Sequence, residues 1–80
     1  LIMKLQVIKQ IVKTSNEDEI NATLKVLEDI SEARKVTSEE LDVIGEIMSN
    51  LYGALIVTED IATGTSATDA VNTFMKRVTL

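Results

Sequence analysis

The feature that most constrains this chain is an uninterrupted helical pattern through its middle. The pattern opens at TSEEL, where Thr37 and Glu40 have the spacing of a capping box. The apolar repeat then runs without a proline to about Ala62, and Gly64 follows where a helix commonly ends in a left-handed residue. The pattern predicts a helix over 39–62, about 36 Å long. Such a helix is as long as a small domain is wide, so the shorter helices either lie end to end along it or leave part of it for a partner.

Three shorter helices are predicted around the long one, because apolar residues recur at helical spacing on both sides of it. The four predicted helices cover about 3–13, 17–35, 39–62 and 67–78. Ser15 or Asn16 is the expected N-cap of the second helix, Arg34 and Lys35 are expected in its last turn, and Ser66 is the expected N-cap of the fourth. The 80 residues include no proline and three glycines. The predicted fold is therefore all-α, a compact four-helix domain over 1–80 with one long third helix.

A line of small residues runs along the predicted third helix. Gly45, Ser49 and Gly53 border its apolar arc, beside a polar ladder that includes Asn50. Each glycine inside a helix costs about 1 kcal/mol relative to alanine, which predicts a compensating close contact with another helix. Packing within the chain is the favoured interpretation, contact with a second chain comes next, and a kink or ligand-linked site comes last. The candidate packing or dimer interface comprises Gly45, Met48, Ser49, Tyr52 and Gly53.

The missing residue types restrict the chemistry. The sequence has no cysteine and no histidine, so it lacks disulfides, thiolate ligands and the commonest general base and metal ligand near neutral pH. It also has no glycine-rich phosphate loop. Five carboxylates on the second and third helices are expected to face solvent: Glu28, Asp29, Glu32, Asp42 and Glu46. We predict no catalytic residue, no cofactor and no metal. An enzyme with an unrecognised carboxylate-based site is the alternative of another class.

Charge is distributed unevenly along the chain, whose net charge is −5. Residues 14–62 hold 12 acidic and three basic residues, whereas residues 1–13 hold three basic residues and no acidic one. An acidic surface opposes nucleic-acid binding. No apolar run reaches the roughly 18–20 residues of a membrane helix, and LIMKLQVI lacks the flanks of a signal peptide. Met3 is the expected natural start. We expect a cytoplasmic protein that binds neither nucleic acid nor membrane.

The segments EELDVIGEIMSNLYGAL and ATDAVNTFMKRV, together with MKLQVIKQIVK and TLKVLEDISE, carry a resemblance that covers roughly residues 3–78. They resemble an uncharacterised family of short, acidic, all-helical proteins from flavobacteria and related bacteria. The resemblance implies a small helical protein with IGEIMSNLYGAL as its characteristic core. It implies no activity and no catalytic or binding residue.

The sequence therefore predicts a protein that acts through protein–protein contacts rather than catalysis. A homodimer is expected, with the third helix in its interface. The alternative within the binding class is an acidic adaptor or antitoxin-like partner of a basic protein. Its binding surface would then be the five carboxylates on the second and third helices.

Overall fold

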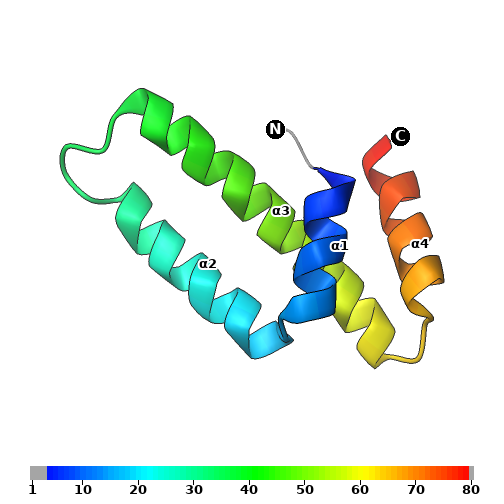
Figure 1. Cartoon of the computed structure of the whole chain (residues 1–80). Helices are drawn as coiled ribbons and strands as arrows, with labels where there is room; N and C mark the ends of the chain where they lie inside the picture. The colour runs from blue at the N-terminus through cyan, green and yellow to red at the C-terminus, as the bar shows by residue number, and fades with distance from the viewer. Residues whose placement is uncertain (1–3, 80) are drawn as a thin grey trace.

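The computed structural model describes the backbone of residues 4–79 and the side chains of residues 4–77, and Figure 1 shows its four helices. They are α1 (Leu5–Thr14), α2 (Glu17–Ser31), α3 (Ser38–Ala62) and α4 (Ala67–Thr79). The described residues contain no strand. The prediction of an all-α fold with a long third helix is confirmed. The predicted start of the first helix at residue 3 lies outside the described residues.

The helix starts follow the predicted capping signals. Asn16 caps α2: its side-chain oxygen accepts from the Glu19 amide at 2.8 Å, and the Glu19 carboxylate accepts from the Asn16 amide at 2.9 Å. Thr37 and Glu40 form the same reciprocal pair at the start of α3, at 3.1 and 2.9 Å. The Ser66 hydroxyl accepts from the amide three residues later, at 3.2 Å, at the start of α4. Each cap satisfies backbone N–H groups that have no partner inside the helix.

The helix ends agree with the sequence for α3 but not for α2. Gly64 follows α3 with φ +104°, and the next amide returns to the Asp60 carbonyl at 3.2 Å, which closes a Schellman motif. By contrast, α2 ends at Ser31 rather than at 35. The amides of Glu32 and Ala33 bond to carbonyls only three residues back, which tightens the last turn. Lys35 then adopts φ 70°, which turns the chain toward α3. Arg34 and Lys35 consequently lie in the loop and not in the last turn of α2.

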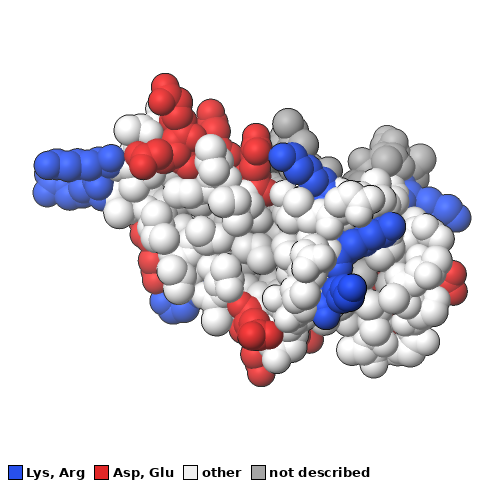
Figure 2. All heavy atoms as spheres, viewed as in Figure 1, with Lys and Arg blue, Asp and Glu red and all other residues white. Residues whose placement is uncertain are grey.

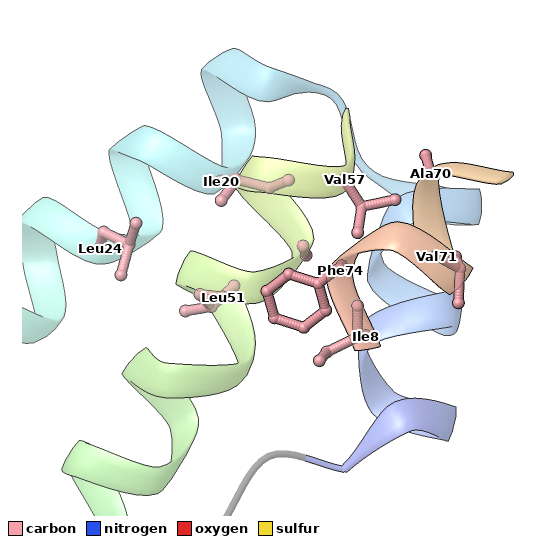
Figure 3. Close-up of a cluster of buried hydrophobic side chains, with 9 residues drawn as sticks. Ile8, Ile20, Leu24, Leu51, Val57, Ala70, Val71 and Phe74 are labelled. Carbon is pink, nitrogen blue, oxygen red and sulfur yellow. The ribbon is translucent and has the colours of Figure 1, made fainter. Parts of the chain in front are cut away.

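The long helix α3 is the member that all the others contact. It forms a hairpin with α2, while α1 crosses its C-terminal half and α4 folds back beside that same half (Figure 1). The core is therefore at this end of α3 (Figure 3). The buried apolar residues are Ile8, Ile20, Leu24, Leu51, Ala54, Val57, Ala70, Val71 and Phe74.

The outer half of the hairpin has no such core. Among residues 25–48, which form the second half of α2, the loop and the first half of α3, none is buried. Length explains this difference: the ten residues of α1 span about 15 Å, whereas the 25 residues of α3 span about 38 Å. One short helix cannot cover the whole side of the long one, so α2 and α3 pack there only against each other.

By length and composition alone, α3 is also long and apolar enough to cross a membrane. The most apolar part of α3 has a mean hydropathy of 1.3, and 33% of that part is buried in the fold. The core helix of a globular domain has the same length and composition, so this property of α3 does not distinguish a membrane-spanning helix from a core helix.

Candidate interaction surface

The line of small residues runs from the core of the protein out to its surface. A Cβ atom on Gly53 would lie 2.9 Å from both Ile8 Cδ1 and Phe74 Cζ, so α1 and α4 both press on the α3 backbone at this point. Ser49 is also buried, with 7% of its surface exposed. At Gly45 the corresponding Cβ position has no atom within 4 Å. Gly53 thus makes its close contact inside the chain, whereas Gly45 faces open space.

The two larger members of the predicted interface, Met48 and Tyr52, differ in their contacts. Met48 is half-buried and packs against the core. Tyr52 is 43% exposed, and its hydroxyl donates a hydrogen bond to Glu28 Oε1 at 2.9 Å, linking α3 to α2. That hydrogen bond raises the pKa of Tyr52 above its ordinary value, because the carboxylate accepts from the protonated phenol.

A group of residues outside the predicted interface forms an exposed apolar surface, which we call the apolar face. Its members each expose 39–56% of their surface: Val7, Val26, Ile30, Val43 and Ile47. Val7, Val43 and Ile47 line one hollow of about 400 Å³ together with Thr23. Val26 and Ile30 follow Thr23 by three and seven residues, so the helical repeat places them on the same side of α2. Figure 2 shows a broad uncharged area on the visible side of the molecule, with both acidic and basic groups around it.

The apolar face exists because α1 covers only part of the apolar stripe of α3. Ile47 and Ala54 are seven residues apart and share one side of α3. Ala54 lies in the core and is 0% exposed, whereas Ile47 is 44% exposed. The apolar sequence pattern continues along this side of α3, but other helices bury only part of it. Periodicity reveals the stripe, while only the position of α1 reveals which part of it stays open.

A buried asparagine fixes the edge of the apolar face. Asn50 is 6% exposed; its Oδ1 accepts from the Lys4 backbone amide at 2.7 Å, and its Nδ2 donates to the Glu46 carbonyl at 3.0 Å. The start of α1 is therefore held beside the middle of α3. The sequence placed Asn50 in an outward polar ladder and so missed this role. The only hint was that Asn50 lies next to Ile47 and Ala54 at the border of the apolar side, about one turn from each.

The edge next to Asn50 carries one cation and one anion. Lys4 and Glu46 both line the hollow of the apolar face. The only ion pair among the described residues joins Lys25 and Asp29 at 2.9 Å, so the Lys4 and Glu46 side chains are not paired with each other within the chain. The apolar face thus has two opposite, unpaired charges at one edge.

The predicted carboxylates do not gather at one place. The helical repeat puts Asp29 and Glu32 on the side of α2 away from α3, and Asp42 and Glu46 on the side of α3 away from α2. Glu28 accepts the hydrogen bond from Tyr52. In the described part of the chain no group of three or more acidic residues is placed to hold a metal ion.

Comparison with known proteins gives a family without an assigned activity. The model of a family of unknown function, DUF6952, matches residues 3–80. Neither the curated proteins nor the solved structures gave a match.

Proposed function

We propose that this chain, which belongs to the family of unknown function DUF6952, acts by protein–protein contact and binds a second copy of itself through the apolar face. The observation that carries the proposal is the group of five large apolar side chains, each 39–56% exposed, on one side of three helices. Single exposed apolar residues are ordinary, but a contiguous patch with a charged border is typical of a binding surface.

The energetics favour covering this surface. Complete burial of a valine or isoleucine side chain contributes about 1.5–3 kcal/mol. About half of each of the five side chains remains exposed, so their burial contributes on the order of several kcal/mol before the costs of association. A chain of 80 residues buries a modest fraction of its surface when it folds alone, so association adds stability where the single chain has little.

A second copy supplies further cover for α3. One α1 helix is about 15 Å long and crosses an α3 helix about 38 Å long, so α1 leaves more than half of α3 without cover. An α1 helix from a second copy would cover part of the remainder. Charge agrees with this arrangement: residues 25–47 carry seven acidic and three basic residues, whereas α1 and its N-cap carry three lysines and no acidic residue.

The test is the mass of the protein in solution for a pair of matched variants. Val43→Glu places a charge in the apolar face at a position 56% exposed, so the new charge is not placed in the core. Leu41→Glu makes the same change at a position 40% exposed and about 200° around the same helix. In sedimentation equilibrium we expect a dimer for the wild type and for Leu41→Glu, and the 8.8 kDa monomer for Val43→Glu. Circular dichroism should show equal helix content in all three.

Two results would overturn the proposal. The first is a wild-type chain that stays at 8.8 kDa at high micromolar concentration. The second is the reverse pattern, in which Leu41→Glu is monomeric and Val43→Glu is dimeric. That pattern would place the interface on the side of α3 that carries Gly45 and Tyr52.

A further inference from the structure

The edge of the apolar face has the properties of a self-complementary contact. In a two-fold symmetric interface, a residue that contacts a second residue across the axis is contacted in turn by the same residue of the other copy. An adjacent cation and anion on either side of the axis therefore make two identical attractive contacts. Lys4 and Glu46 are such a neighbouring pair, because both line the same hollow.

The backbone at both charged positions is held in place by the protein. The Lys4 amide and the Glu46 carbonyl bond to one side chain, that of Asn50, which is 6% exposed. The backbone at both positions is thus fixed by a buried group. Since the charged ends are not joined to each other within the chain, they are available to another molecule.

Resting on the proposed self-association, we infer that the two-fold axis of the dimer passes between Lys4 and Glu46. Lys4 of each copy then pairs with Glu46 of the partner subunit. This arrangement places the outer hairpin of each copy over α1 of the other, so the acidic residues 25–47 meet the lysines of α1. Rim charges of this kind set the orientation and specificity of an interface more than its total affinity.

The experiment is a reciprocal charge reversal. Lys4→Glu alone and Glu46→Lys alone each create two like-charge contacts, and we expect each to raise the dimer dissociation constant by roughly five- to tenfold. The double variant Lys4→Glu/Glu46→Lys should return to the wild-type value. A mixture of the two single variants should form a heterodimer of wild-type affinity, because both of its contacts join unlike charges.

The controls keep the charge change but move it to α4. Lys76→Glu and Asp69→Lys alter the net charge equally at exposed positions away from the hollow. Neither single reversal at the edge removes a hydrogen bond found in the structure, because Lys4 and Glu46 bond to Asn50 through backbone atoms. A change in helix content is therefore not expected.

The outcomes separate the axis from the self-association. If Val43→Glu abolishes the dimer but the edge reversals change its dissociation constant no more than the α4 controls, the axis is wrong and the self-association stands. The axis is also wrong if the mixed single variants form no heterodimer. If the wild-type chain is monomeric, both proposals fail.

Discussion

The backbone amide of Lys4 donates a hydrogen bond to Asn50 Oδ1 at 2.7 Å, across 46 residues of chain. Lys4 is the N-cap residue of α1, and its own side chain makes no capping hydrogen bond. Asn50 therefore anchors the first helix to the third at the point where the core meets the apolar face. Both the oxygen and the nitrogen of its side-chain amide have a hydrogen-bond partner, as a buried amide requires.

We expect Asn50→Ala to lower the free energy of unfolding by about 1–3 kcal/mol, because the Lys4 amide loses its partner and the core gains a small cavity. Asn72→Ala on α4 is the control, since that asparagine is exposed. Denaturant unfolding followed by circular dichroism measures both. Equal midpoints for the two variants would show that the anchor contributes nothing to stability.

The two glycines of α3 should respond to alanine in opposite ways. At Gly45 the added Cβ meets open space, so Gly45→Ala should stabilise the fold by about 1 kcal/mol through helix propensity. At Gly53 the Cβ would meet Ile8 and Phe74 at 2.9 Å, and both are buried and cannot move freely. Overpacking costs about 1–3 kcal/mol, so Gly53→Ala should be net destabilising. Thermal melts of the two variants test both expectations. A higher melting temperature for Gly53→Ala would contradict the packing at Gly53, and a lower one for Gly45→Ala would contradict the open space at Gly45.

Local signals in the sequence account for most of the fold. The caps at Thr37 and Ser66 and the end at Gly64 depend on residues within a few positions of each other, so they could be read directly. The end of α2 could not, because Lys35 takes a left-handed conformation that its side chain does not favour. The hairpin connection requires that turn, and no local pattern encodes it.

The candidate surface was less accessible to sequence reasoning for a different physical reason. Ile30 has the spacing of a core residue on α2, yet it is 43% exposed. Periodicity gives the direction of a side chain and says nothing about whether another helix reaches it. The apolar face depends on where α1 crosses α3, and that crossing depends on contacts such as Lys4 to Asn50.

The capping box of α3 should contribute to acid sensitivity. Hydrogen bonds from the Thr37 backbone and side chain lower the pKa of Glu40 from its ordinary 4.5. A lowered folded pKa means that the stabilisation is present above pH 4.5 and is lost as the pH falls through the folded value. Glu40→Gln should therefore flatten the melting temperature against pH below 4.5, whereas Glu39→Gln, outside the capping box, should not. Superimposable profiles for Glu40→Gln and the wild type would refute the expectation.

The link between Tyr52 and Glu28 should be visible in an alkaline titration. The hydrogen bond to Glu28 raises the pKa of Tyr52 above 10.0, so its stabilising effect is present below pH 10.0 and is lost as the pH rises through the folded value. The chain has one tyrosine, and its tyrosinate absorbance therefore reports this site alone. Glu28→Gln should move the titration to lower pH, with Glu32→Gln as the control. An unchanged midpoint in Glu28→Gln would exclude the link in solution.

The position of α1 also has a consequence for the order in which the protein assembles. The contacts of α2 with α3 and of α3 with α4 join helices that are neighbours in the chain. The contacts of α1 join it to α3, from which it is separated in sequence by the whole of α2. Closing a long loop costs more entropy than closing a short one, so we expect α1 to dock late. On the ribosome α1 is made before α2 and α3, yet it is covered only after α3 is available. Ile8, which is 0% exposed in the finished fold, stays open to solvent and to chaperones until the residues of α3 have emerged.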